Sequence, residues 1–300
     1  MRNLLTLFDL DKSAFDSIMA DTPKFKNRTY HDKFLANKNI GLIFEKPSTR
    51  TRVSAEVAVG NLGGNAIYLG SSELQLNRGE SVEDTAKVLS RYLDGLIIRS
   101  KSHTFLEKFS EHSEIPVINA LSDKAHPLQI LADFHTIVEN GLDMNRVNMC
   151  FLGDGQNNVC RSLMEGFTFY NGLLNIAAPE VYFPDKSYLD SILSRGGRIK
   201  VFSDPHEAVL NSDVLYTDVW VSMGYESESE VRKTRLKSYQ ISMDTIRATR
   251  AKPIVMHCLP AQKGEEISAE AFSSPNSKIF DQAENRLYSL QAVLKYCFSG

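Results

Sequence analysis

The chain has 300 residues, of which 42% are hydrophobic and 24% are charged, and its formal net charge is −3. This composition supports ordinary buried cores and excludes a disordered or fibrous chain. Because acidic and basic residues are interspersed, no broad positive field is available to hold a nucleic acid or an anionic membrane, so neither is an expected partner. The length favours two domains.

The N-terminus and the cysteines indicate the compartment. Acidic Asp9 and Asp11 interrupt the chain before any long apolar stretch develops, unlike a secretory signal, and no stretch is long enough to span a bilayer. The four cysteines lack the short paired spacing that is typical of zinc sites and disulfide frameworks. They are Cys150, Cys160, Cys258 and Cys297. We therefore expect reduced thiols in a cytoplasmic protein with no bound metal.

Short apolar runs bounded by turn residues recur along the whole chain and predict buried strands. They cover residues 40–44, 95–98, 116–118, 147–152, 173–177, 199–202, 214–217 and 253–256. The segments between them have the length and mixed polarity of helices. This alternation predicts an α/β fold of parallel sheets flanked by helices.

A helix predicted over residues 128–140 is long enough to connect two such sheets, and Asn140-Gly141 supplies its stop. We place the domain boundary in this helix. One domain then comprises residues 1–133 with a C-terminal helix over residues 283–300. The other comprises residues 134–282.

Two later segments have distinct patterns. The final helix carries an apolar stripe, which periodicity alone assigns to neither domain. Its members are Leu287, Leu290, Val293 and Leu294. Residues 225–237 are strongly polar and charged, and we interpret them as a candidate mobile loop.

A cluster of hydroxyls and guanidinium groups follows the run that ends at Phe44. Ser48, Thr49, Arg50 and Thr51 precede small and apolar residues that suit a packed helix. A helix N-terminus offers unpaired amides and a partial positive charge, and arginine adds bidentate geometry, so this element is suited to a phosphate dianion. The alternative is that Ser48 or Thr49 only caps the helix while the arginines lie in solvent.

The run Pro47-Ser48-Thr49-Arg50-Thr51-Arg52 resembles the element that holds the phosphate of carbamoyl phosphate in the aspartate/ornithine carbamoyltransferases. His126-Pro127-Leu128-Gln129 resembles the His-Pro-x-Gln element of the same family, although a lone histidine before proline is also typical of capping or packing. The resemblance implies that Thr51, Arg99 and His126 donate to the carbamoyl oxygen, where negative charge develops during attack. It also implies that Gln129 accepts from the carbamoyl NH2, while Arg50 stays on the departing phosphate.

Two further segments carry the family resemblance with less specificity. Gln75 matches a glutamine that in relatives reaches the phosphate of the neighbouring subunit, although its surroundings, residues 72–76, depart from the usual wording. If the match holds, the protein is a homotrimer with shared active sites. Residues 281–286 resemble the family's C-terminal element, which implies that Arg286 joins the carbamoyl phosphate site.

Two motifs match the ornithine branch of the family. The first contains Asp218, Ser222 and Met223, and the second contains Cys258 and Leu259. Asp218 and Ser222 are chemically suited to the α-amine of ornithine. The resemblance implies that Cys258, with the Leu259 carbonyl, orients the side-chain amine, although an isolated cysteine is more simply a small buried hydrophobe.

The glycine-rich turn that follows residues 147–152 has two readings. It contains Gly153 and Gly155, so it could open a dinucleotide site, but the third glycine and the expected acid are missing. The turn more closely resembles the family's Gly-Asp-x-x-Asn-Asn element. In that case Asn158 contacts the carboxylate end of ornithine, with Asn157 as the alternative.

The resemblance implies a carbamoyl-phosphate-binding first domain, an ornithine-binding second domain and an active-site cleft between them. The expected reaction converts carbamoyl phosphate and L-ornithine to L-citrulline and phosphate without a metal or organic cofactor. Arg50, Arg99, His126 and Cys258 are the expected catalytic residues. Arginine biosynthesis is the favoured role, although the catabolic direction would use the same site. Putrescine, N-acetylornithine and aspartate are alternative substrates, and a noncatalytic binding subunit is the alternative from another class.

Overall fold

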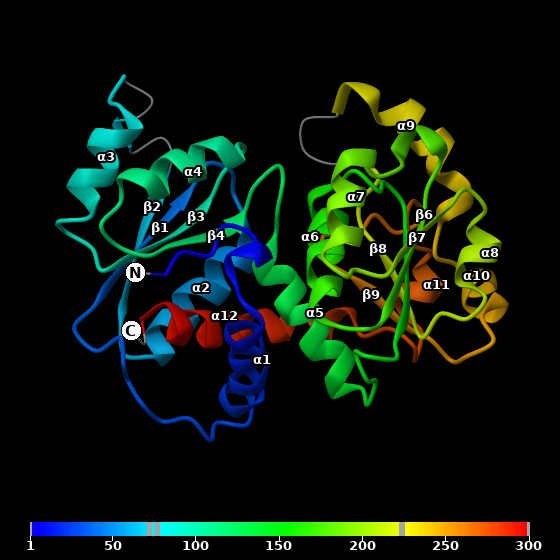
Figure 1. The fold of residues 1–300 in the computed structure, drawn as a ribbon, viewed down its shortest axis with the longest axis horizontal. Coiled ribbons are helices and arrows are strands. Elements are labelled where there is room, and N and C mark those ends of the chain that lie inside the picture. Colours follow the sequence, from blue (N-terminus) through cyan, green and yellow to red (C-terminus); the bar gives the residue numbers. More distant parts are fainter. Residues whose placement is uncertain (1, 71–73, 76–78, 222–225, 299–300) are drawn as a thin grey trace. The chain divides into compact units, whose positions relative to one another are not determined.

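The computed structural model describes residues 2–70, 74–75, 79–221 and 226–298. Its internal contacts divide the chain into two compact units. Unit 1 comprises Met1–His135 and Glu284–Gly300, and unit 2 comprises Thr136–Ala283 (Figure 1). The chain passes from one unit to the other inside α5 (Pro127–Glu139) and returns inside α12 (Ile279–Phe298).

Unit 1 is built on a parallel sheet with the strand order β2-β1-β3-β4. The strands are β1 (Asn39–Phe44), β2 (Asn65–Gly70), β3 (Gly95–Arg99) and β4 (Val117–Leu121). Phe44 lies opposite Arg99 in the register, and Arg99 lies opposite Leu121. The carboxyl ends of β1, β3 and β4 are therefore aligned, so the loops that follow them emerge at one edge of the sheet.

Helices cover both faces of the unit 1 sheet (Figure 1). They are η1 (Leu7–Asp9), α1 (Lys12–Lys26), α2 (Thr49–Asn61), α3 (Val82–Leu89) and α4 (His103–His112), with the second part of α12. Ser48, Ser81 and Ser102 cap α2, α3 and α4, because each hydroxyl accepts from a backbone amide of the first turn. Ala86 of α3 and Phe109 of α4 are buried against Ile98 of β3.

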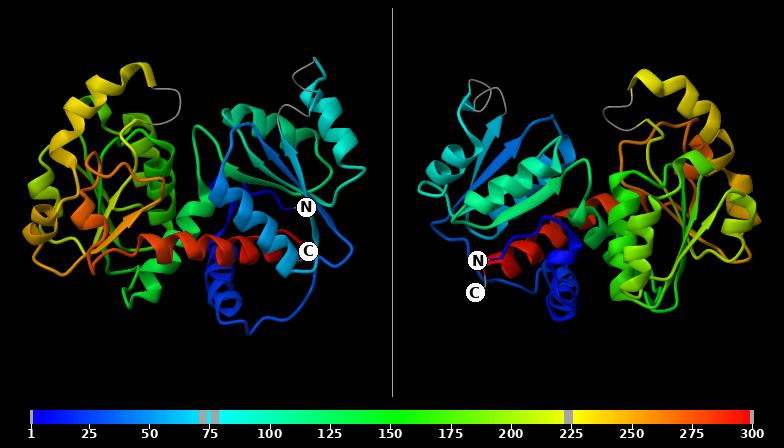
Figure 2. Two further views of the ribbon diagram at one scale, coloured as in Figure 1. Left: turned by 180° about the vertical axis from the view of Figure 1, so that it is seen from behind. Right: turned by 45° about the horizontal axis from the view of Figure 1, so that its top comes forward.

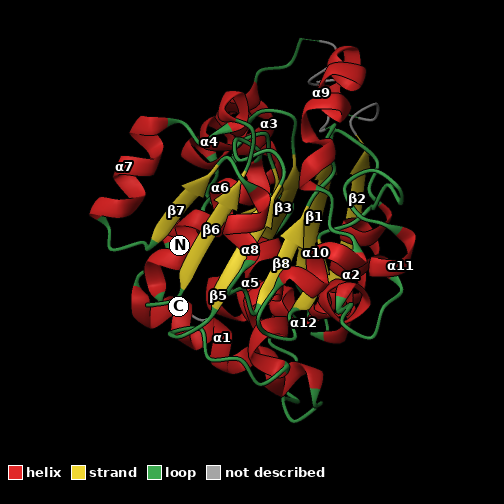
Figure 3. Cartoon of the chain, turned by 90° about the vertical axis from the view of Figure 1, so that its right-hand side faces the viewer, coloured by secondary structure: helices red, strands yellow, loops and turns green. Residues whose placement is uncertain are grey.

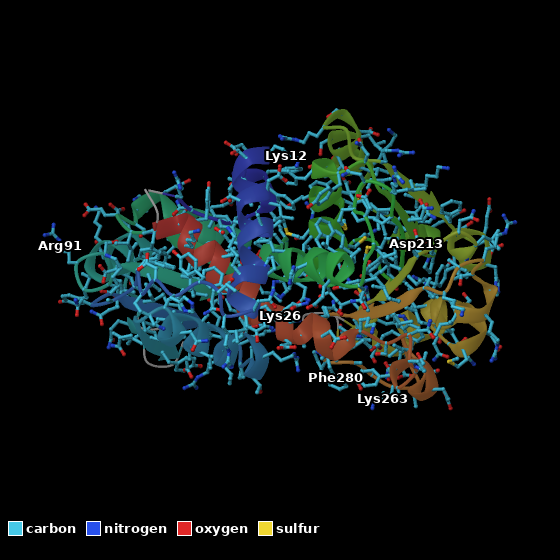
Figure 4. The ribbon with its side chains drawn as sticks, turned by 90° about the horizontal axis from the view of Figure 1, so that it is seen from below. Lys12, Lys26, Arg91, Asp213, Lys263 and Phe280 are labelled. Atoms are coloured by element: carbon cyan, nitrogen blue, oxygen red, sulfur yellow. The ribbon has the colours of Figure 1, made fainter. Side chains whose placement is uncertain are left out.

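The C-terminal part of α12 packs beside α1 in unit 1, as Figure 2 shows. Lys26, at the end of α1, donates from Nζ to Asn285 Oδ1 at 2.9 Å and lies beside α12 in Figure 4. Lys295 Nζ pairs with Asp21 at 2.7 Å. The first contact lies next to Arg286 in the sequence, and the second lies in a later turn of the same helix.

Unit 2 is built on a second parallel sheet, with the strand order β7-β6-β5-β8-β9. Its strands are β5 (Asn148–Leu152), β6 (Leu173–Ala177), β7 (Ile199–Phe202), β8 (Val214–Thr217) and β9 (Ile254–His257). The β7-to-β8 part of this order can be followed in Figure 3. The chain order reverses between β5 and β8, and such a switch point is where open α/β sheets bind ligands. The predicted α/β fold with two parallel sheets is confirmed.

The helices of unit 2 are mostly short. They are α6 (Asn158–Gly166), η4 (Phe167–Phe169), η5 (Glu180–Tyr182), α7 (Lys186–Ser194), α8 (Pro205–Val209), η6 (Glu226–Glu228), α9 (Ser229–Leu236), η7 (Lys237–Tyr239), α10 (Met243–Ala248) and α11 (Ala269–Phe272). The predicted loop over residues 225–237 is wrong for its described part, since residues 226–237 are helical. Arg232 and Leu236, one helical turn apart, are buried and anchor this polar segment.

One helix was predicted correctly, and one strand was missed. The connecting helix predicted over residues 128–140 is α5, and Gly141 ends it with a φ of +81°, a backbone conformation that favours glycine. Strand β2 was not predicted. Its residues 66–69 form a short apolar run between Asn65 and Gly70, but the strand lies at the edge of the sheet and none of its residues is fully buried. In the described part of the chain, no helix is long and apolar enough to cross a membrane.

Candidate active site

The first turn of α2 brings the predicted phosphate-binding hydroxyls together. Ser48 Oγ accepts from the Thr51 amide at 3.4 Å, so it caps the helix, as the alternative interpretation required. Thr51 is buried, and its Oγ1 accepts from Arg286 Nη2 at 2.8 Å. Thr49 is exposed. The N-terminus of α2 and the Arg286 guanidinium therefore concentrate positive charge at one point.

The two arginines of the motif have different surroundings. Arg52 is exposed, where its Nε donates to Glu56 at 2.8 Å and its guanidinium lies 3.7 Å from the centre of the Tyr68 ring. Arg50 is half-buried on the first turn, and no carboxylate of the described residues pairs with it. Of these two arginines, Arg50 is therefore the one whose guanidinium can bind an external anion.

Glu45 connects the ends of β1 and β3. Its amide donates to the Arg99 carbonyl at 3.0 Å, and its Oε2 accepts from Ser100 Oγ at 2.5 Å and from the Lys101 amide at 2.7 Å. These bonds hold the backbone around Arg99 against the loop that leads to Arg50. Sequence reasoning did not single out Glu45.

His126 follows a tightly bonded loop after β4. Ser122 and Ala125 exchange hydrogen bonds, since the Ser122 amide donates to the Ala125 carbonyl at 2.9 Å and the Ala125 amide donates to Ser122 Oγ at 3.1 Å. Buried Asn119 Nδ2 donates to the same carbonyl at 3.3 Å. Pro127 then begins α5, a position that proline favours.

The His126 imidazole is buried near two guanidinium groups. Burial, with the charges of Arg286 and Arg99, holds the pKa of His126 well below its ordinary value. The ring is therefore neutral at physiological pH and carries one N–H donor. These three predicted site residues lie close enough to influence one another.

Gln129 lies on the first turn of α5 and is buried. Its Nε2 donates to Asp133 Oδ1 at 2.8 Å, one helical turn later. No partner for its buried Oε1 occurs among the described residues. This leaves an amide oxygen as the acceptor, which is the group that the predicted role of Gln129 requires.

Gln75 does not join this cluster in the structure. Its side chain is exposed, and most of its flanking residues, 71–73 and 76–78, lie outside the described part. Its predicted contact with a neighbouring subunit stays a prediction.

In unit 2, the ends of β8 and β9 bring Asp218 and Cys258 together. Cys258 Sγ donates to Asp218 Oδ1 at 2.9 Å, the Val219 amide donates to the same oxygen at 2.8 Å, and Asn157 Nδ2 donates to Oδ2 at 3.2 Å. Burial raises the pKa of Asp218, although His257, Cys258 and Val219 oppose the shift. The site therefore offers a buried carboxylate with directed acceptor oxygens.

The Asn157-Asn158 pair divides into two roles. Asn157 caps α6, since its Oδ1 accepts from the Cys160 amide at 2.7 Å, and its other end donates to Asp218. Both ends of the Asn157 amide are thus engaged within the protein. Asn158 begins α6 and is half-buried. The predicted contact of Asn158 with the carboxylate end of ornithine stays a prediction.

Close packing within the protein explains why residue Gly155 of the glycine-rich turn is a glycine. A Cβ at this position would lie 2.8 Å from the Tyr182 carbonyl oxygen and 2.9 Å from Pro184 Cδ. The close approach is to the protein's own chain, so Gly155 requires no dinucleotide to explain it. Neighbouring Asp154 is buried and pairs with Arg232 of α9.

Arg232 connects three segments of unit 2. Its Nε donates to the Trp220 carbonyl at 2.8 Å, its Nη2 pairs with Asp154, and its guanidinium lies 4.6 Å from the centre of the Tyr182 ring. Burial outweighs this pairing and raises the pKa of Asp154. Ser222 and Met223, which follow Trp220 closely and were predicted to bind ornithine, lie outside the described residues.

His257 and Glu266 form a buried pair beneath Leu259. His257 Nδ1 accepts from the Leu259 amide at 2.8 Å, so its proton resides on Nε2, which contacts Glu266 Oε1 at 2.9 Å. Leu259 has a φ of +59° and precedes a cis peptide bond to Pro260. The pair thus holds the unusual backbone that follows Cys258.

One group of side chains has the composition of a metal site. Potential ligand atoms of Asp218, His257 and Cys258 lie within 4.8 Å of one another. However, both ring nitrogens of His257 are already engaged by Leu259 and Glu266. Metal binding would require these bonds to break.

The residues that sequence reasoning missed share one property. They lie outside the predicted motifs, and each is bonded to another residue in or near the candidate site. These residues are Glu45, Asp133, Arg232 and Glu266. A spacing of four residues between Gln129 and Asp133 was a signal that the sequence offered. The partners of the other three become apparent only in the fold.

Family models match both units. The model described as aspartate/ornithine carbamoyltransferase, carbamoyl-P binding domain, matches residues 2–139, and the model described as the Asp/Orn binding domain of the same family matches residues 145–297. The chain belongs to the aspartate/ornithine carbamoyltransferase family. The resemblance inferred from the motifs is confirmed, and the protein is a carbamoyltransferase.

Individual family members match over nearly the whole chain. An ornithine carbamoyltransferase from Methanosphaera stadtmanae is 47% identical over 302 residues, covering 99% of each chain. The solved ornithine carbamoyltransferase from Pyrococcus furiosus has a TM-score of 0.93 and 41% identity, and the match covers 100% of this chain and 97% of that chain. An anabolic ornithine carbamoyltransferase from Campylobacter jejuni also gives a TM-score of 0.93, with 36% identity and 99% coverage of each chain.

Proposed function

We propose that this protein transfers the carbamoyl group of carbamoyl phosphate to the side-chain amine of L-ornithine, giving L-citrulline and phosphate. The observation that carries the proposal is the near full-length similarity to chains named ornithine carbamoyltransferase, at 47% identity for the Methanosphaera stadtmanae relative. The residues of the two candidate clusters supply the chemistry that this reaction needs.

Unit 1 is proposed to bind carbamoyl phosphate. The phosphate dianion accepts from the hydroxyls and amides at the start of α2 and from guanidinium groups, because charge-assisted bonds to a helix N-terminus suit a dianion. The proposed contacts are Ser48, Thr49, Arg50, Thr51, Arg99 and Arg286, with Gln75 from a neighbouring subunit. Gln129 Oε1 accepts from the carbamoyl NH2, and Leu259 and Cys258 complete the proposed contacts.

Catalysis is proposed to depend on fixed donors at the carbamoyl oxygen. As the amine nitrogen bonds to the carbamoyl carbon, the carbonyl oxygen gains negative charge, which Thr51, Arg99 and neutral His126 stabilise. The bond between that carbon and the phosphate oxygen then breaks, and both bonding electrons leave with phosphate under the charge of Arg50. The attacking nitrogen loses one proton to the departing phosphate, which gives citrulline and hydrogen phosphate. A fixed neutral imidazole donates a hydrogen bond here without having to lose a proton.

Unit 2 is proposed to bind ornithine. Asp218 and Ser222 accept from its α-ammonium, Asn158 contacts its carboxylate end, and Met223 completes the site. The side-chain ammonium must lose a proton before its nitrogen can attack, and Cys258 with the Leu259 carbonyl orients the resulting amine. A buried carboxylate at Asp218 favours a cationic group and disfavours the second carboxylate of aspartate.

The reaction as proposed uses no metal or organic cofactor, because phosphate is a competent leaving group and the oxyanion has protein donors. We further propose a cytoplasmic homotrimer with shared active sites, acting in arginine biosynthesis. The opposite, catabolic direction would use the same residues, so measured flux in cells decides between them.

The direct test is to incubate purified protein with carbamoyl phosphate and L-ornithine and to measure citrulline and phosphate. The proposal predicts equal molar amounts of the two products. A folded protein that binds carbamoyl phosphate but forms no citrulline would contradict the proposal and favour the noncatalytic alternative.

A further inference from the structure

We propose that Asp133 is a positioning residue that orients the Gln129 amide and thereby makes the site select carbamoyl phosphate over acetyl phosphate. The inference rests on the proposed function, since it assigns carbamoyl phosphate to unit 1. Asp133 is fully buried on α5, one turn after Gln129, and both side chains belong to unit 1. Neither the motifs nor the family descriptions assign a role to Asp133.

The two ends of an amide side chain are almost equal in size. Rotation by a half-turn exchanges the oxygen and the NH2 of glutamine with little change in shape, so the partners decide which end points where. In this pair the Asp133 carboxyl group is the acceptor. Asp133 Oδ1 lies 2.8 Å from Gln129 Nε2, so the NH2 faces Asp133. The opposite orientation would set two acceptor oxygens against each other in a buried place.

The consequence is a buried amide oxygen that requires a donor. Gln129 is buried, and its Oε1 has no hydrogen-bond partner among the described residues. A buried acceptor without a donor is costly, and a ligand that supplies an N–H removes the cost. The carbamoyl NH2 is such a donor.

Carbamoyl phosphate and acetyl phosphate differ at this point alone. Both present a phosphate and a carbonyl oxygen, so Arg50, Arg99 and His126 bind them alike. Acetyl phosphate places a methyl group where carbamoyl phosphate has its NH2, and the Gln129 oxygen then stays unsatisfied. Sites built to hydrogen-bond a polar group reject the analogue that lacks it strongly, and we expect a preference of at least about 100-fold here.

The test replaces Asp133 by asparagine, which has the same shape but can donate as well as accept. Gln129 can then present either end of its amide to the ligand. We expect the dissociation constant of carbamoyl phosphate to rise about 10-fold while that of acetyl phosphate stays within about 2-fold, so the preference falls about 10-fold. Calorimetry on the full chain measures both constants without turnover.

Asp21→Asn is the matched control. Asp21 is also a buried carboxylate of unit 1, but it pairs with Lys24 and Lys295. Its replacement removes a similar group without touching Gln129, so the preference should not change. A preference that fell equally in both variants would show general loosening and would overturn the inference.

A second test separates orientation from structure. If Asp133 acts through Gln129, Asp133→Asn should have no further effect on the preference in a Gln129→Ala background. Should Asp133→Asn fail to fold, Gln129→Met still decides, because it removes the acceptor and leaves Asp133 in place. An undiminished preference in folded Gln129→Met would overturn the inference.

These outcomes are distinct from a failure of the proposed function. If wild-type protein binds carbamoyl phosphate selectively but forms no citrulline, the transfer reaction is wrong and the inference about Asp133 stands. If wild-type protein forms citrulline but Asp133→Asn weakens both ligands equally, the proposed function stands and the inference is overturned.

Discussion

Arg286 donates a hydrogen bond to Thr51 Oγ1 over 2.8 Å, although the two residues are 235 positions apart in the sequence. Both side chains are buried in unit 1. Helix α12 therefore supports the first turn of α2, so this cluster depends on two segments that are far apart in the sequence.

Thr51→Val tests this relationship, because it keeps the shape of the side chain and removes the acceptor. A guanidinium that loses a buried partner costs about 1.5–3 kcal/mol, so we expect the KM for carbamoyl phosphate to rise about 10-fold to 100-fold. Ser54→Ala is the control, since Ser54 lies on the same helix and its hydroxyl donates to the Thr51 carbonyl at 3.2 Å. An unchanged KM in folded Thr51→Val would contradict the proposed contact.

The pH dependence of His126 gives a second prediction. Its pKa lies well below the ordinary value of 6.5 because of burial and the charges of Arg286 and Arg99. The stability that this shift contributes is therefore present above pH 6.5 and is lost as the pH falls toward the folded pKa. Between pH 7 and pH 5, the Tm of the wild type should fall more than the Tm of His126→Gln, and kcat should show no limb near pH 6.5 from His126. An equal fall in Tm for the wild type and His126→Gln would contradict a neutral His126 imidazole.

The pKa of Asp218 is shifted in the opposite direction. Burial raises its pKa above the ordinary 3.8, so the stability contribution is present below pH 3.8 and is lost as the pH rises through the folded pKa. Ionisation of this buried carboxyl group as the pH rises therefore works against the folded state.

Asp218→Asn should therefore raise the Tm at pH 7.5 while it weakens ornithine binding, and the gain in Tm should shrink as the pH falls toward 4. Thermal melts across this range and the KM for ornithine measure the two effects. Asp244→Asn removes the same charge from an exposed position and should show neither effect. A lower Tm for Asp218→Asn throughout would mean that its hydrogen bonds outweigh the burial of its charge.

The Arg232 and Asp154 pair supports a fourth prediction. Replacing one partner of a buried pair leaves the other charge uncompensated, at a cost of about 3–5 kcal/mol, so Arg232→Met should lower the free energy of unfolding by that amount. The KM for ornithine should rise as well, because Arg232 holds the Trp220 carbonyl and the turn before Asn157. Chemical denaturation and steady-state kinetics measure the two effects.

Two variants control this prediction. Lys233→Met changes the neighbouring cation of α9, which lies at the surface and pairs with Glu265, so it should lower the free energy of unfolding far less than Arg232→Met does. The double variant Arg232→Met with Asp154→Leu should recover part of the lost stability. A double variant that is no more stable than the single one would indicate that Arg232 stabilises mainly through Trp220 and Tyr182.

The sequence predicted the parts of the fold that depend on continuous apolar runs. The eight predicted strands are present, and most of them are largely buried, although β7 at the edge of its sheet is not. Strand β2, at the edge of the other sheet, was missed although its residues 66–69 are apolar. The helical segment that contains Arg232 was predicted to be a loop because charged residues dominate its sequence. The burial of Arg232 could not be predicted, because its partner Asp154 lies far away in the sequence.

The residues of the candidate site also fall into a group that was predicted and a group that was missed. Arg50, His126 and Cys258 belong to motifs that are contiguous in the sequence, so they were found. Asp133 and Glu266 act on these regions through hydrogen bonds to Gln129 and His257. The helical spacing of Gln129 and Asp133 was a local signal, whereas the contact of Glu266 with His257 becomes apparent only in the fold.

Substrate selectivity is the sharpest test of the proposed carbamoyl transfer to ornithine. Purified protein should be given carbamoyl phosphate with L-ornithine, putrescine, N-acetylornithine or L-aspartate under matched conditions, and kcat/KM compared. We predict that ornithine exceeds each alternative by at least about 100-fold, since putrescine lacks the carboxylate, acetylation removes the α-ammonium and aspartate brings a second carboxylate toward Asp218. Preferred turnover of any other amine would retain the carbamoyl transfer but contradict the roles given to Asp218, Asn158 and Cys258.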